Sequence, residues 1–181
     1  MVKEGDRAPD FELPSLAGKQ VRLGLITPLW PVLLVFFRTS CEACERLMPV
    51  LTGFQRNYGD ADIEILAVSQ DGRLRTEEFV ERVRWPGRVL IDHPQQTVSE
   101  MYGIDRLPAL VLVGTDMGVV ATADASRPES IEEMSRSVAS VVGWSYKRIL
   151  PVGMEDVEIE PCLSRTRTEQ QGELHRQSKA S

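Results

Sequence analysis

The fold is decided by the stretch Val32-Leu33-Leu34-Val35-Phe36-Phe37, which leads through Arg38-Thr39-Ser40 into Cys41-Glu42-Ala43-Cys44. The apolar run is too short for a helix and rich in strand formers, so it predicts a strand buried on both faces. Beyond it, large apolar residues recur in steps of four and three along one helical face: Leu47, Leu51, Phe54 and Tyr58. The stretch therefore predicts a buried strand that turns into a helix, which Pro49 is expected to kink.

The apolar pattern after this helix predicts an α/β fold with a mixed sheet. A second apolar run at 63–68 completes a βαβ unit, which should be right-handed. Further on, the runs 109–113 and 119–123 flank a glycine-containing turn and predict an antiparallel hairpin. The sequence also predicts an N-terminal hairpin of 11–13 with 21–23 and a strand at 89–91. A helix capped by Thr76 and a helical turn from Thr97 to Gly103 are predicted on either side of that strand. The last predicted helix begins with a Ser126/Glu129 capping box and ends at Gly143.

Composition limits the class of protein. With 181 residues, 42% of them hydrophobic, the chain is long enough for one domain with an appendage. We expect a domain over residues 1–146 and a polar, flexible or loosely docked C-terminal tail over 147–181. The net charge of −6 without a long basic block argues against nucleic acid as a partner.

No stretch of the sequence predicts a membrane span. The longest apolar run, 31–37, is far shorter than the roughly 20 residues that cross a bilayer. The chain opens without a basic segment followed by an apolar one, so we expect a cytoplasmic protein. An exported or periplasmic protein would look the same if a signal had been removed.

The spacing of the cysteines carries the chemical information. Cys41 and Cys44 lie one helical turn apart at the start of the predicted helix, so a disulfide between them can close. The helix dipole and unpaired N–H groups favour the Cys41 thiolate as the attacking group, which leaves Cys44 to resolve the mixed disulfide. Two ordinary buried cysteines or half of a zinc site are the alternatives. Zinc needs four ligands, and Cys162, His93 and His175 are each isolated, so we expect no metal.

Three segments together resemble a known family: 5–13, 36–44 and 105–113. They resemble the TlpA/ResA-like branch of the thioredoxin superfamily, close to MauD-like proteins, and the resemblance covers about residues 5–143. It implies a thioredoxin-like three-layer α/β/α sandwich with a mixed central sheet and an N-terminal β-hairpin. It also implies thiol–disulfide oxidoreductase activity on protein or small disulfide substrates, an electron-donating reductase as partner, and no cofactor beyond the redox-active disulfide.

The resemblance also implies a substrate groove beside the cysteines. In this family the residue matching Pro108 follows a cis peptide bond, here Leu107-Pro108, opposite the active cysteines. A proline entering an apolar strand is restricted to the strand start or a tight turn, which agrees with this position. Ser40, Glu42 and Ala43 would complete the groove, although family members usually carry Trp where this chain has Ser40.

Further departures concern proton transfer and charge. The acidic residue that many relatives carry three positions after the second cysteine is Leu47, and the buried Asp or Asn of the preceding strand is Val35. No obvious buried carboxylate is therefore predicted near the resolving thiol. Glu42 should disfavour a thiolate, whereas Arg38 and Arg46 are possible modulators that offset it.

The sequence matches two alternative functions less well, and it leaves two roles open for the third cysteine. A peroxiredoxin-like peroxidase needs a Pro-x-x-x-Thr-x-x-Cys motif, but Leu34 and Arg38 stand at its Pro and Thr positions. A copper chaperone would use the two cysteines with His93, but this chain has one residue fewer between its cysteines than chaperones of this fold. Cys162 is either an incidental thiol or a third redox partner on a mobile arm, and the entropy of closing so long a loop favours the incidental thiol.

Overall fold

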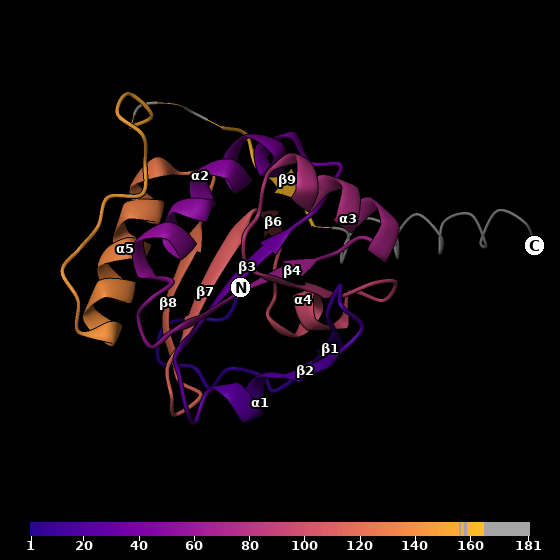
Figure 1. Cartoon of the computed structure of the whole chain (residues 1–181), viewed down its shortest axis with the longest axis horizontal. Helices are drawn as coiled ribbons and strands as arrows, with labels where there is room; N and C mark the ends of the chain where they lie inside the picture. Colours follow the sequence, from indigo (N-terminus) through magenta and orange to yellow (C-terminus); the bar gives the residue numbers. More distant parts are fainter. Residues whose placement is uncertain (156, 158, 165–181) are drawn as a thin grey trace, which may run out of the picture.

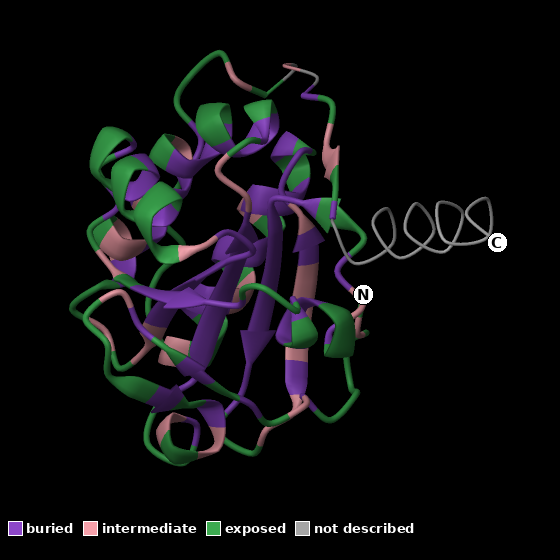
Figure 2. Cartoon of the chain, turned by 90° about the vertical axis from the view of Figure 1, so that its right-hand side faces the viewer, coloured by how far each residue is buried: buried purple, intermediate pink, exposed green. Residues whose placement is uncertain are grey.

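The computed structural model of the chain describes residues 1–155, 157 and 159–164, and its centre is a five-stranded sheet (Figure 1). The strand order is β5-β4-β3-β7-β8. The bounds are β3 (Val32–Phe37), β4 (Glu64–Ser69), β5 (Arg88–Ile91), β7 (Ala109–Val113) and β8 (Val119–Asp124). β3, β4 and β5 run parallel, while β7 is antiparallel to both β3 and β8. The predicted mixed sheet and the hairpin at its edge are confirmed. β3 and β7 are completely buried, whereas most residues of the edge strand β8 are only partly buried (Figure 2).

Helices cover both faces of this sheet. They are α1 (Leu23–Ile26), α2 (Glu42–Tyr58), α3 (Arg73–Arg82), α4 (Thr97–Met101) and α5 (Pro128–Val142). Neighbouring residues of a strand point to opposite faces. Phe37 stacks on Phe79 of α3 at 5.3 Å, whereas Phe36 lies 5.6 Å from Tyr102, which follows α4. Successive right-handed crossovers put α2 beside α3, and the Tyr58 hydroxyl of α2 lies 2.8 Å from Ser135 Oγ of α5.

The expected layers are therefore present, with α2, α3 and α5 on one face and α4 on the other. The N-terminal hairpin of β1 (Glu12–Pro14) and β2 (Gln20–Arg22) is also confirmed. A bridge between Ser15 and Leu90 attaches it next to β5. Phe11, just before β1, contacts Tyr102 edge-to-face at 6.1 Å, so the N-terminal segment packs on the α4 side of the sheet.

Two predicted helix caps are wrong. α3 begins at Arg73, and Thr76 lies buried inside it with its hydroxyl 2.7 Å from Ser69 Oγ. Ser126 does not cap α5 either, because its hydroxyl donates to Asp124 Oδ1 at 2.6 Å and the helix begins at Pro128. In both cases the hydroxyl bonds to a residue of the neighbouring strand. The predicted stop at Gly143 is confirmed, with φ of +68°, a backbone conformation that favours glycine.

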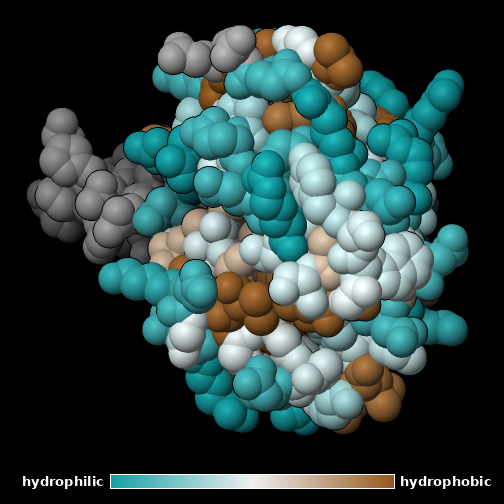
Figure 3. All heavy atoms as spheres, turned by 90° about the vertical axis from the view of Figure 1, so that its left-hand side faces the viewer, coloured by the Kyte–Doolittle hydropathy of each residue, from teal (hydrophilic) through white to brown (hydrophobic). Residues whose placement is uncertain are grey.

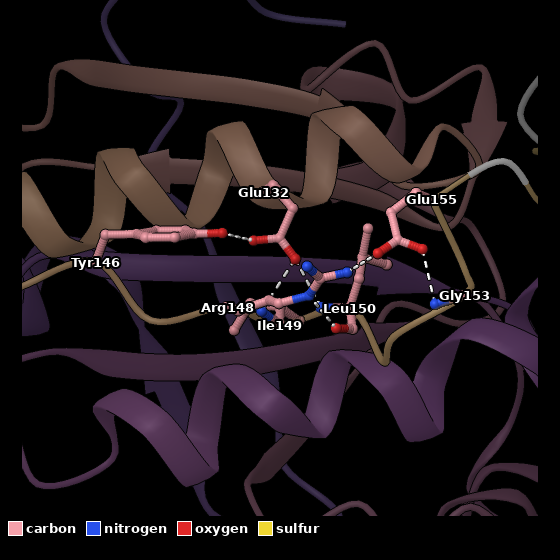
Figure 4. Close-up of polar contacts among 7 residues, drawn as sticks. All are labelled: Glu132, Tyr146, Arg148, Ile149, Leu150, Gly153 and Glu155. Atoms are coloured by element: carbon pink, nitrogen blue, oxygen red, sulfur yellow. Dashed lines mark hydrogen bonds and ion pairs between the residues drawn. The ribbon is translucent and has the colours of Figure 1, made fainter.

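The chain after α5 differs most from expectation, because the described part of residues 147–164 packs on the domain. Ile149 and Leu150 are buried. Ile149 fits against Gly53 of α2, where an added Cβ would lie 3.2 Å from its Cγ2 atom. Glu132 of α5 accepts hydrogen bonds from the N–H groups of Ile149 and Leu150 at 3.1 and 2.7 Å and from the Tyr146 hydroxyl (Figure 4). These contacts fix the direction in which the chain returns across the domain.

The described chain ends in a second small sheet, in which β9 (Cys162–Leu163) pairs antiparallel with β6 (Arg106–Leu107). Residues 165–181, with His175, lie outside the described residues. The face that carries α5 is mostly hydrophilic and is crossed by a short apolar band (Figure 3). No helix in the described part of the chain is both long and apolar enough to span a bilayer.

Candidate active site

Cys41 lies where the central strand has ended and α2 begins. Its backbone is extended, with φ of −108° and ψ of 118°, and it is the N-cap residue of the helix. Its Sγ atom accepts a hydrogen bond from the backbone N–H of Cys44 at 3.3 Å. A sulfur in this position receives a helix N–H group and the positive end of the helix dipole, and both stabilise a thiolate. Cys41 is 1% exposed and Cys44 0% exposed.

The Cys44 thiol is held in its neutral form. Burial raises its pKa from the ordinary value of 9.0 to about 12. The Arg38 backbone N–H and guanidinium oppose this rise, whereas the carboxylate charge of Asp71 adds to it. Arg38 Nε is buried and has no hydrogen-bond partner within the described residues. Of the two predicted modulators, Arg38 thus acts on the resolving cysteine, while Arg46 lies exposed on α2.

The Leu107–Pro108 peptide bond is cis, as the resemblance implied. Both residues are buried, and the Leu107 carbonyl oxygen lies 3.9 Å from Cys41 Sγ. The loop before β7 therefore forms one wall beside the attacking sulfur. Among the other predicted groove residues, Ser40 and Glu42 are exposed and Ala43 is buried.

The third cysteine is not incidental, and the sequence-based expectation for it is wrong. Cys41 forms a disulfide with Cys162 of β9, across a sequence separation of 121 residues and a Cα–Cα distance of 5.8 Å. Cys44 keeps a free thiol. A random-coil arm would lose entropy on closing so long a loop, but packing along α2 and α5 and pairing with β6 already hold this arm in place.

Asp71 is a site residue that the sequence analysis missed. Its carboxylate is 1% exposed and accepts hydrogen bonds from the Thr39 N–H at 2.7 Å and the Thr39 hydroxyl at 2.9 Å. Asp71 follows β4, the parallel neighbour of β3, and the carboxyl ends of parallel neighbours meet at one sheet edge. The neighbouring ends of these two strands were the signal in the sequence that could have indicated Asp71. Neither the active-site helix nor its preceding strand carries a buried carboxylate, so patterns within these two elements give no sign of Asp71.

No cluster within the described residues brings three His, Cys, Asp or Glu side chains close enough to hold a metal ion. His93 lies exposed in the loop that follows β5. Its peptide bond to Pro94 is also cis. The two cysteines and His93 therefore do not form the three-ligand set of the chaperone alternative.

A cysteine pair at the start of the helix that follows the central strand, facing a cis-proline loop, defines a thioredoxin-like redox protein. The chain belongs to the AhpC/TSA family, which it matches over residues 4–122.

Curated relatives and solved structures agree with this class. The chain is 35% identical over 113 residues to the thiol-disulfide oxidoreductase ResA of Geobacillus thermodenitrificans, a match covering 62% of the chain and 64% of that protein. The match to the ResA of Halalkalibacterium halodurans is 28% identical over 134 residues, 74% of the chain and 75% of that protein. The chain thus spans less than two thirds of the first relative. A crystal structure from Chlorobium tepidum, assigned as thiol:disulfide interchange protein DsbE, superimposes with a TM-score of 0.71 and 26% identity, covering 79% of the chain and 100% of that structure.

Proposed function

We propose that this protein is a thiol–disulfide oxidoreductase that works through Cys41 and Cys44. One observation carries the proposal: Cys41 Sγ lies at the start of α2 and 3.9 Å from the Leu107 carbonyl oxygen, and it is engaged in a disulfide. The sulfur is thus placed to exchange disulfides with a chain lying along the cis-proline loop. The similarity to proteins named thiol-disulfide oxidoreductase supports the same activity.

The reaction begins at Cys41. Its thiolate attacks one sulfur of a substrate disulfide, forms a mixed disulfide with that sulfur, and releases the other as a thiolate. Cys44 then attacks Cys41 Sγ, closes the Cys41–Cys44 disulfide and releases the second substrate thiolate. Two electrons pass from the dithiol to the substrate in this direction. The same steps run in reverse when a substrate dithiol is oxidised.

The resolving step requires Cys44 to lose its proton inside a buried site. The guanidinium of Arg38 stabilises the thiolate that forms. Asp71 is the buried carboxylate that acts electrostatically on Cys44, and we assign it as the proton acceptor. The carboxylate of Asp71 is held by two hydrogen bonds from Thr39, which fix its orientation.

The substrates are disulfides of proteins or small molecules, and an electron-donating reductase completes the cycle. The backbone edge of β6 favours an extended peptide once β9 has left it, because a strand added there gains main-chain hydrogen bonds. β9 pairs with this edge in the described structure, with Cys162 in register with Leu107. A substrate cysteine in the same register would present its sulfur to Cys41.

The test is a redox titration of the Cys41–Cys44 pair combined with an insulin-reduction assay. Cys41→Ser should abolish insulin reduction, and Leu74→Ala, an exposed position on α3, should leave it unchanged. The double variant Cys44→Ser/Cys162→Ser should accumulate a mixed disulfide at Cys41, because no other cysteine of the chain remains to attack it. Insulin reduction that survives Cys41→Ser would contradict the proposal. Turnover of hydrogen peroxide without insulin reduction would instead support the peroxidase alternative.

A further inference from the structure

β9 occupies the edge of β6 beside the attacking cysteine. Leu107 is in register with Cys162 and Arg106 with Leu163, and the next residue continues the pairing, because the Ser164 N–H donates to the Asp105 carbonyl oxygen at 2.9 Å. Three successive residues of the C-terminal segment are therefore aligned against the loop that ends in Pro108. The segment binds as an added strand, the arrangement expected for an extended peptide.

Side-chain contacts fix this strand on both sides of the cysteine. Ser164 is 2% exposed, and its hydroxyl accepts a hydrogen bond from Gln70 Nε2 at 2.6 Å. Gln70 is held in turn by Gln96, whose Nε2 donates to the Gln70 carbonyl oxygen at 3.2 Å. Before the cysteine, Ile159 is buried in the hydrophobic core. A buried polar contact and a buried apolar anchor indicate a position built into the fold.

The start of the segment is anchored as well. Arg148 forms an ion pair with Glu155 and donates to the Leu150 carbonyl oxygen at 2.9 Å, and the Gly153 N–H donates to Glu155 at 2.7 Å (Figure 4). With the Glu132 contacts described above, these bonds direct the chain from the end of α5 toward the active site. The segment that carries Cys162 to Cys41 is therefore held by contacts on its way from α5.

We propose that Cys162 is a third redox-active cysteine, the internal disulfide partner of Cys41, and that it exchanges with the Cys41–Cys44 disulfide. The proposal rests on the proposed function, which supplies a substrate disulfide as the oxidant. In the exchange the Cys162 thiolate attacks Cys41 Sγ, the Cys41–Cys162 bond forms, the Cys41–Cys44 bond breaks, and Cys44 leaves as a thiolate that takes up a proton. No net electrons move, because one disulfide replaces another.

The geometry sets the order of events. A substrate strand and β9 use the same edge of β6, so they cannot bind there together. Cys44 therefore resolves the substrate mixed disulfide first, and Cys162 takes its place on Cys41 after the product has left. The burial that raises the pKa of Cys44 favours this second state, since the released thiolate is converted to the neutral thiol. The resulting oxidised protein has its peptide-binding edge covered.

The test maps disulfides in the full chain. Reduced protein is oxidised with 2-hydroxyethyl disulfide, quenched with acid, alkylated with N-ethylmaleimide and digested with trypsin. Cys41 and Cys44 fall in one tryptic peptide, 39–46, and Cys162 falls in another, 149–165. We expect the cross-linked pair of these peptides, with one alkylated cysteine, to exceed the internally closed 39–46 peptide at least tenfold. A closed 39–46 peptide with alkylated Cys162 as the main product would overturn the proposal.

Variants identify the sulfur atoms and the role of the strand. Cys44→Ser should keep the cross-link and Cys41→Ser should lose it. Ser164→Ala removes the bond to Gln70 without changing a cysteine, so the cross-linked fraction should fall severalfold. Leu163→Ala, at a neighbouring side chain that is 63% exposed, is the matched control and should leave it unchanged. Equal cross-linking in Ser164→Ala and Leu163→Ala would contradict a built position for β9.

This result is separable from the proposed function. A protein that forms the Cys41–Cys162 bond but does not reduce insulin would contradict the proposed function and support the third redox cysteine. A protein that reduces insulin through Cys41 and Cys44 but never forms the cross-link would do the reverse.

Discussion

The stability gained on oxidation should report which disulfide the protein holds. A disulfide removes conformational entropy from the unfolded chain, and the amount grows with the loop that it closes. For cysteines 121 residues apart the chain-entropy relation gives about 5 kcal/mol. The same relation gives only about 2 kcal/mol for the short Cys41-x-x-Cys44 loop. The two isomers therefore differ by about 3 kcal/mol in the free energy of unfolding of the oxidised protein.

The measurement is guanidinium chloride unfolding of oxidised and reduced protein, followed by circular dichroism. Wild type and Cys44→Ser should both lose about 5 kcal/mol on reduction, since both can hold the long-range bond. Cys162→Ser can close only the short loop and should lose about 2 kcal/mol. The denaturant dependence should also be shallower for the long-range bond, because a cross-linked unfolded chain exposes less surface. If wild type behaves like Cys162→Ser, the assignment of the Cys41–Cys162 disulfide is wrong.

Three further outcomes follow from burial and hydrogen bonding. In reduced protein Cys44 keeps its proton when folded but ionises near pH 9.0 when unfolded. The free energy of unfolding should therefore fall by about 1.4 kcal/mol per pH unit as the pH rises from about 9 toward 12. Urea titrations of wild type and Cys44→Ala at pH 8 and pH 10 should differ in this pH dependence, and an equal dependence would contradict the raised pKa. Phe79→Ala removes a side chain that is 1% exposed and stacked on Phe37, which should cost about 3–5 kcal/mol by chemical denaturation, against less than about 0.5 kcal/mol for the exposed Leu74→Ala on the same helix. Asp92→Ala removes a carboxylate that accepts two backbone N–H groups of α4 at 3.0 and 2.7 Å, so unfolding should become easier by about 1–2 kcal/mol, and an unchanged midpoint would show that the cap is dispensable.

The sequence predicted the elements whose signal is local. Three elements carry their signal within their own residues, and the structure places all three as expected: the apolar run ending at Phe37, the helical spacing from Leu47 to Tyr58, and the hairpin at 109–123. The helix caps failed because a hydroxyl can bond to whichever group tertiary packing brings near it. Thr76 bonds to Ser69 across a loop, a contact that no pattern within the helix could have indicated.

The active-site residues also fall into those that local sequence predicts and those that only long-range contacts place. The positions of Cys41, Cys44 and Pro108 could be predicted because strand, turn and helix follow one another in the chain. β9 has two residues and no periodic pattern, and only its pairing with β6 makes it a strand. The polar sequence around β9 predicted a flexible tail. Composition describes the average solvation of a segment and does not show a single long-range contact.

The route of the C-terminal segment also decides what can be attached to this protein. Ser164 is bonded to Asp105 one residue beyond the strand that carries Cys162, so the chain leaves the described structure beside the redox centre. A tag, reporter or partner domain joined directly after Ser164 would begin next to the attacking sulfur and would compete with substrates for access. The other end of the chain is attached elsewhere, with the Val2 N–H donating to the Tyr102 carbonyl oxygen at 2.8 Å on the α4 side. Fusions intended to leave the exchange reaction undisturbed belong at the N-terminus.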